Sequence, residues 1–277
     1  MPPDHKDNLV ALNTLTDFQS RKQAAFHDFV HQFDPVQFAL EVLGFSPDPV
    51  QAQLMHTQHR RVIVNCSRQW GKSTTAAAIA AHRLIHGPDN SLSIVISPSA
   101  RQSGELIRKV AAFLSRTGVK IKGDGDNDIS ILHPNGSRIV GLPGRDHTTR
   151  GFSAVSLLII DEASRVTDTV YRAVRPMLTA SNGRLFLLST PYGKRGFFFN
   201  EWMRAAQSEN SPIPWTRVSV PASLCQRLAP ELLEEEKIAL GENFFNQEYN
   251  CEFLDTQDQS FPYSLVYGAF SKEVEPI

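Results

Sequence analysis

The amino-acid sequence predicts an α/β fold, in which helices flank a mostly parallel β-sheet. From residue 61 onward, short apolar runs alternate with stretches of helical periodicity, an alternation typical of βαβ units. The runs are rich in Val, Ile and Leu without polar residues between them, as expected of strands that are covered on both faces. The chain has 277 residues, of which 41% are hydrophobic and 21% are charged, so it can bury a core.

Residues 1–48 are expected to form a helical segment ahead of this alternation. Its apolar residues repeat at spacings of three and four, which places them on one helical face. These residues are Phe26, Phe29, Val30 and Phe33. Asp34-Pro35 and Asp48-Pro49 each join a capping side chain to a proline at the first helical position, so a helix is expected after each pair. The helix after the first pair is expected to end at Gly44.

The remaining elements follow in order along the chain. Core strands are expected at 61–66, 92–97, 155–161 and 184–189, with a further strand near 215–220. Helices are expected at 73–86, 101–116, 196–207 and 230–240. Between 128 and 141, two short strands flank Asn135-Gly136, a pair that strongly favours a β-hairpin.

Composition and charge argue against several classes of protein. No apolar run approaches the roughly 18 residues that span a bilayer, and the polar N-terminus lacks the core of a signal peptide, so a cytoplasmic protein is expected. The three cysteines lie far apart, so they predict neither a disulfide framework nor a zinc site. The net charge of −1 gives no overall attraction to nucleic acid, so any DNA contact requires a local cluster of Lys and Arg.

The segment from the strand at 61–66 into the next helix has the features of a phosphate-binding loop. Gly71 lets the main chain approach an anion, and the start of the helix offers free N–H groups to phosphate oxygens. Lys72 can reach the β- and γ-phosphates of a nucleotide, and the hydroxyl of Ser73 can ligate Mg²⁺. Cys66 stands where the full pattern has glycine, and Arg68 adds a second cation. The predicted nucleotide-binding residues are Ser67, Arg68, Gln69, Trp70, Gly71, Lys72, Ser73 and Thr74.

Four aliphatic residues followed by two carboxylates at 157–162 predict a Walker B motif. Asp161 is expected to hold the Mg²⁺ ion, and Glu162 is expected to polarise the attacking water. A plain strand that ends in an Asp-Glu turn is the alternative, but Lys72 upstream and the strand–helix unit between them favour catalysis. We therefore predict a P-loop NTPase domain of the RecA-like (ASCE) type over residues 49–255, with Glu162, Lys72 and Arg68 as catalytic residues.

Three further segments are candidates for coupling, catalysis and DNA binding. Ser189 and Thr190 end a core strand, where hydroxyls can sense the γ-phosphate; a strand-ending turn is the alternative. Arg150 stands before a glycine on a basic loop and could reach the nucleotide of a neighbouring subunit; a solvated arginine is the alternative. Lys194 and Arg195 lie between glycines and could hold DNA phosphates; a solvated basic turn is the alternative.

Taken together, these motifs resemble the ATPase domain of a tailed-phage large terminase, a DNA-packaging motor. The loop 67–74 resembles the family's arginine-bearing Walker A motif, Asp161-Glu162-Ala163 its Walker B motif, Leu188-Ser189-Thr190-Pro191 its coupling motif and Arg150-Gly151 its arginine finger. Residues 45–51 resemble the segment that contacts adenine, which implies that Gln51 binds the base. Residues 245–249 and Glu252-Phe253 resemble the segment that closes the domain.

The resemblance implies an ATP hydrolase that uses Mg²⁺ and drives translocation of double-stranded DNA into a phage procapsid. It implies that Arg68 acts in cis and Arg150 in trans, within a homo-oligomeric ring, with a monomer as the alternative for the isolated chain. It also implies a portal protein and a small terminase subunit as partners, a bacterial host cytoplasm and no membrane. Family members usually continue into an RNase H-like nuclease domain. Residues 256–277 are expected to be only a tail or the start of a linker, so no nuclease activity is expected.

Two other functions compete with this interpretation. A related P-loop helicase or remodeller usually carries a second RecA-like domain, for which 277 residues leave no room. An inactive prophage remnant that only binds nucleotide would not need Lys72, Asp161 and Glu162, all of which are intact.

Overall fold

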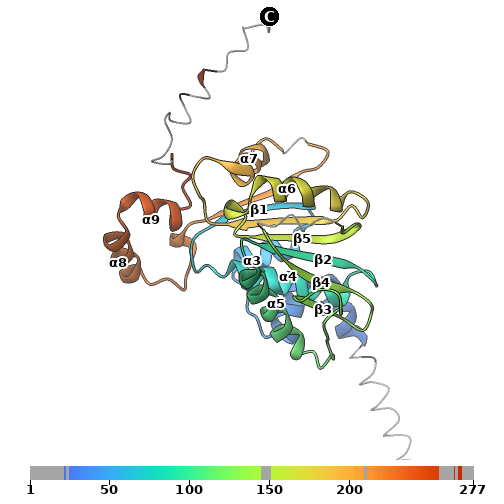
Figure 1. Ribbon diagram of the computed structural model, residues 1–277. Helices are drawn as coiled ribbons and strands as arrows, with labels where there is room; N and C mark the ends of the chain where they lie inside the picture. Colours follow the sequence, from blue (N-terminus) through green and yellow to red (C-terminus); the bar gives the residue numbers. More distant parts are fainter. Residues whose placement is uncertain are drawn as a thin grey trace, which may run out of the picture.

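The computed structural model is an α/β fold around one seven-stranded sheet, with helices on both faces (Figure 1). The structure describes residues 22, 25–144, 151–208, 211–255, 265 and 268–269. The strands are β1 Arg61–Cys66, β2 Leu92–Ser97, β3 Ser130–Leu132, β4 Arg138–Pro143, β5 Val155–Asp161, β6 Arg184–Ser189 and β7 Trp215–Val220. They lie in the order β3-β4-β2-β5-β6-β1-β7, so the predicted fold class and the four core strands are confirmed.

The sheet is parallel except at one edge. The pair β3–β4 is antiparallel, and the other neighbouring strands run parallel. The predicted hairpin is confirmed, because Gly136 takes the left-handed φ of 81° in the turn between β3 and β4. Since β4 also pairs parallel with β2, the hairpin extends the main sheet instead of forming a separate one.

Helices cover both faces of the sheet, which explains the apolar runs of its strands. The helices are α2 Pro35–Phe38, α3 Pro49–His56, α4 Lys72–His86, α5 Ala100–Ser115, α6 Asp168–Val174, α7 Gly196–Ala205, α8 Pro230–Leu240 and α9 Glu242–Glu248. The last two, α8 and α9, pack on each other beside the sheet (Figure 1). Val62 and Val64 of β1 pack in the core that contains α3, α4 and α5. Ile63, between them, packs in the core of α6 and α7 on the opposite face. Among the described residues, no helix is both long and apolar enough to cross a membrane.

The N-terminal helical segment differs from the sequence prediction in one respect. The helix after Asp34 passes from α2 into a π-helical turn, Ala39–Leu43, before Gly44 ends it with a φ of 60°. The preceding residues 25–33 are helical, and their phenyl rings lie on one face as predicted, but this face is exposed. Phe26, Phe29 and Phe33 are 65%, 60% and 68% exposed. The segment contacts the domain through His31 instead, whose carbonyl accepts a hydrogen bond from His82 Nε2.

Candidate active site

The site lies at the edge of the sheet where β5, β6 and β1 end side by side. These strands are neighbours and run parallel, with Asn65 opposite Ser189 and Asp161 opposite Leu188. Carboxyl ends of parallel strands meet at one edge, so the loop after β1 and the acids that end β5 are brought together. This edge is the part of an open α/β sheet where ligands bind.

The loop between β1 and α4 requires an unusual backbone. Gln69 and Gly71 have positive φ values of 59° and 97°. The φ of Gly71 is one that residues with side chains rarely adopt, so the loop needs glycine there for its conformation. The loop is fixed to the neighbouring strand by the N–H of Ser67, which donates to the carbonyl of Val220 at 2.9 Å.

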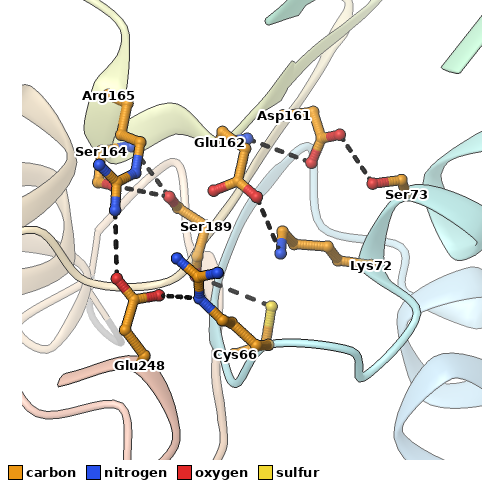
Figure 2. Close-up of polar contacts among 10 residues, drawn as sticks. Cys66, Lys72, Ser73, Asp161, Glu162, Ser164, Arg165, Ser189 and Glu248 are labelled. Carbon is orange, nitrogen blue, oxygen red and sulfur yellow. Dashed lines mark hydrogen bonds and ion pairs between the residues drawn. The ribbon is translucent and has the colours of Figure 1, made fainter. Parts of the chain in front are cut away.

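The N-terminus of α4 supplies the first half of the site. The helix begins at Lys72, so the N–H groups of its first turn have no partner within the helix and can bind an anion. Lys72 Nζ lies 3.0 Å from Glu162 Oε1 (Figure 2). Burial opposes the charge of Lys72, but the neighbouring carboxyl groups of Glu162 and Asp161 outweigh burial and raise its pKa. Lys72 is therefore a permanent cation at the point where phosphates would bind.

Two oxygen atoms beside Lys72 suit a divalent cation. Ser73 Oγ donates a hydrogen bond to Asp161 Oδ2 at 2.9 Å (Figure 2). Asp161 is only 6% exposed, and burial together with the charge of Glu162 raises its pKa. Hydroxyl and carboxylate oxygens are the ligands that Mg²⁺ prefers, and a cation would compensate the buried negative charge. The residues present thus fit the predicted Mg²⁺ ion.

Glu162 is held in a conformation that is costly for a residue with a side chain. Its φ of 52° lies in the left-handed region, just after β5 ends. Residues with such backbones persist where the surrounding structure imposes them, and they cluster at functional sites. The conformation directs the carboxylate of Glu162 at Lys72, away from the core that the preceding residues fill.

Glu248 of α9 joins the site, although its role was not predicted from the sequence. Its buried carboxylate bridges two arginines (Figure 2). Arg68 Nε donates to Glu248 Oε2 at 2.8 Å, and Arg165 Nη2 donates to Glu248 Oε1 at 3.1 Å. The N–H of Arg68 also donates to the carbonyl of Glu248. The hydrogen bond that Arg68 donates to Glu248 raises the pKa of Arg68. The predicted second cation of the loop is therefore fixed to the last turn of α9.

Both the nitrogen and the oxygen of the Gln51 side-chain amide form hydrogen bonds within the protein. Its Nε2 donates to the carbonyl of Trp70 at 3.1 Å, and its Oε1 accepts from the N–H of Asp48 at 2.9 Å. Arg227 also donates to the carbonyl of Trp70. The indole of Trp70 is buried in the core, so only its main chain can face a nucleotide. Gln51 thus ties α3 to the loop, and its contact with a base stays a prediction.

The other loop residues differ in how accessible they are. Gln69 is exposed and Thr74 is half-buried. Ser67 is buried, and its hydroxyl has no hydrogen-bond partner among the described residues. Such a buried hydroxyl would gain from a polar ligand at the loop.

The hydroxyl of Ser189 connects the end of β6 to the residues that follow Glu162. Ser189 Oγ donates to Ser164 Oγ at 2.8 Å and accepts from the N–H of Ser164 at 3.1 Å (Figure 2). Thr190 is buried beside it. Ser189 therefore lies against the residues that follow Glu162, and a role of Ser189 and Thr190 in coupling stays a prediction.

The loop that follows the coupling residues is attached to the C-terminal part of the described chain. Lys194 Nζ lies 2.9 Å from Asp255 Oδ2, so its charge is paired. The guanidinium of Arg195 stacks 4.7 Å from the ring centre of Tyr192, and that of Arg165 lies 4.4 Å from the same ring. The remaining predicted residue, Arg150, belongs to residues 145–150, which lie outside the described residues.

Comparisons with known proteins identify the family of this chain. Residues 63–266 match the family described as terminase large subunit, T4likevirus-type, N-terminal. The terminase large subunit of Thermus virus P23-45 is 26% identical over 253 residues, covering 80% of this chain and 51% of that protein. The chain spans about half the length of the curated relatives it matches.

Solved structures share the fold. The ATPase domain of the Thermus phage P74-26 large terminase superposes with a TM-score of 0.67 at 21% identity, covering 78% of this chain and 97% of that one. The large terminase of another thermophilic bacteriophage, in complex with ADP, gives a TM-score of 0.61 at 12% identity, covering 81% of this chain and 53% of that one.

Proposed function

The chain belongs to the family of N-terminal domains of T4likevirus-type terminase large subunits, and we propose that it hydrolyses ATP to drive packaging of double-stranded DNA. One observation carries the proposal. The anion-binding start of α4, with Lys72, directly faces Asp161 and Glu162 at the end of a parallel strand of the same sheet. A cation for phosphates, two oxygens for Mg²⁺ and a carboxylate for water are the components that P-loop hydrolysis needs.

The residues of this chain would bind the nucleotide first. N–H groups of the first turn of α4 and the ammonium of Lys72 would hold the phosphates. Ser73 and Asp161 would hold Mg²⁺, which when bound neutralises phosphate charge that develops in the reaction. The Lys72–Glu162 ion pair would weaken at this step, because the phosphates would compete with Glu162 for the three N–H donors of the ammonium.

Weakening of that ion pair would prepare Glu162 for its role. A carboxylate bound to an ammonium is a weak base, since the positive charge stabilises the ionised form. Once Lys72 binds phosphate, Glu162 is free to orient a water molecule and accept its proton at a carboxylate oxygen. ATP itself would then switch on the base, so the enzyme would not activate water without its substrate.

The partners and assembly form part of the same proposal. We place double-stranded DNA, a portal protein and a small terminase subunit as partners, with Arg150 completing the site of a neighbouring subunit in a ring. In this proposal, residues 49–255 form the ATPase domain, and the helical segment 1–48 lies outside the nucleotide site.

Steady-state ATPase assays of the purified chain, with and without double-stranded DNA, test the proposed function. We expect Mg²⁺-dependent phosphate release that DNA stimulates. An absence of turnover at any protein concentration would favour an inactive nucleotide-binding protein. Strand separation on a forked duplex would favour the helicase alternative, because packaging moves a duplex without unwinding it.

Replacing Glu248 with glutamine is expected to lower the free energy of unfolding by about 2 kcal/mol. This value lies between the ~0–1 kcal/mol of exposed ion pairs and the ~3–5 kcal/mol of buried ones, because the carboxylate is buried but both arginines are partly exposed. ATP turnover should also fall, since Arg68 loses its fixed position. Urea unfolding and ATPase assays measure the two effects, with Glu252→Gln as an exposed control from the same segment. Equal behaviour of the two variants would contradict the bridging role.

Replacing Arg195 with alanine is expected to weaken binding to all duplex sequences equally and to reduce the salt slope by about one unit. Lys194→Ala should have the smaller effect, because Lys194 is already paired with Asp255. Fluorescence anisotropy with unrelated duplexes at several salt concentrations gives both values. An unchanged slope in both variants would move the DNA contact to another surface.

A further inference from the structure

Three side chains that could ligate a metal ion lie close together in the helical segment that precedes the nucleotide loop. They are His27 and His31 of the helical residues 25–33, and Glu41 of the π-helical turn. Glu41 Oε2 lies 2.7 Å from His31 Nε2 and 3.5 Å from His27 Nδ1. Each residue has a ligand atom within 4.8 Å of those of the other two.

The spacing and the donor set suit zinc. Histidines four residues apart project from the same face of a helix, the arrangement that zinc enzymes with two helical histidines use. Two histidines and one glutamate form a known ligand set, with a water molecule at the fourth position. Ligands at about 2.1 Å in tetrahedral geometry lie roughly 3.4 Å from one another, so the distances to Glu41 need only small adjustments.

The surroundings of Glu41 and His31 support a metal site further. Gln37 Nε2 donates to Oε1 of Glu41, the oxygen that does not face the histidines, and such outer contacts orient metal-binding carboxylates. The side chain of His31 is 9% exposed and that of His27 is 50% exposed, so one ligand is anchored and solvent can reach the ion.

We propose that His27, His31 and Glu41 bind a divalent transition-metal ion, with zinc as the physiological one. The ion would link the helical residues 25–33 to the π turn, beside the contact between the rings of His31 and Phe38. It would also fix the direction in which Phe26, Phe29 and Phe33 face solvent. This site is independent of ATP hydrolysis, because none of its ligands belongs to the nucleotide loop.

Isothermal titration of untagged, chelator-treated protein with Zn²⁺ tests the proposal. We expect one zinc ion per chain, and affinity at least about tenfold weaker in His27→Ala and in Glu41→Gln. Cobalt should give the visible absorption of a tetrahedral site in the unmodified protein and lose it in both variants. Hydrogen exchange of residues 25–33 should slow when zinc is added.

The matched control is His59→Ala, which removes a histidine that bonds to Thr216 elsewhere on the surface. It should bind zinc as the unmodified protein does. His27 and Glu41 are both exposed at the surface, so their variants should fold, and circular dichroism verifies this. Absence of zinc binding, or affinity that is the same in all three variants, would overturn the proposal and leave the cluster as a hydrogen-bond network only.

Discussion

Replacing Lys72 with alanine is expected to lower ATP turnover by on the order of 10³-fold or more, to the background of the assay. Removal of a single neutral donor at a transition state already costs about 10²–10³-fold, and Lys72 carries a full charge. Its ammonium lies 3.0 Å from Glu162 and its side chain is only 11% exposed, so water cannot easily replace it. Affinity for ATP should fall as well, because the β- and γ-phosphates lose their cation.

The measurement is phosphate release under saturating ATP, together with binding of a fluorescent nucleotide. Lys109→Ala is the matched control, because it removes an exposed lysine from α5. Circular dichroism shows whether the carboxylates of Asp161 and Glu162, now without Lys72, disturb the fold. Substantial turnover in a folded Lys72→Ala protein would refute the assignment of the loop.

Glu162→Gln should bind ATP normally and hydrolyse it at least ~100-fold more slowly, because general-base catalysis contributes about this factor. Glutamine has the same shape and can still contact Lys72 through its carbonyl, so the effect isolates the loss of basicity. The variant should therefore retain nucleotide affinity while turnover falls, the opposite of the affinity loss expected for Lys72→Ala.

Rapid-quench kinetics of a single turnover separates chemistry from product release. Glu235→Gln, an exposed glutamate of α8, is the control. If Glu162→Gln kept the unmodified rate of the chemical step, another group would have to be the base.

Local sequence signals were sufficient for the strands and for the centre of the site. Val155–Asp161 is buried at every position, so the apolar run in the sequence predicted both ends of this strand correctly. The residues of the predicted phosphate loop and of the predicted Walker B segment are each consecutive in sequence, so both could be proposed without the fold. α6 and α9 were missed, because helices of seven residues show hardly two turns of periodicity.

Contacts between segments that are distant in the sequence could not be predicted from it. Arg68 and Glu248 are separated by 180 positions, and nothing in either segment indicates the other. The phenyl face of residues 25–33 has the spacing of a buried helix, yet Phe26 is exposed. Periodicity shows which residues share a face, but whether another element covers that face depends on the tertiary structure.

The position of β6 between β1 and β5 determines which part of the domain can move. Both edges of β6 are hydrogen-bonded along its length, so it cannot slide past one neighbour without breaking the ladder to the other. The three strands therefore form a rigid frame, which limits how far Ser189 could move. In the proposed motor, a displacement on phosphate release would then begin after Thr190, in the segment that carries Lys194 and leads into α7. The central sheet would stay fixed while the elements around it move.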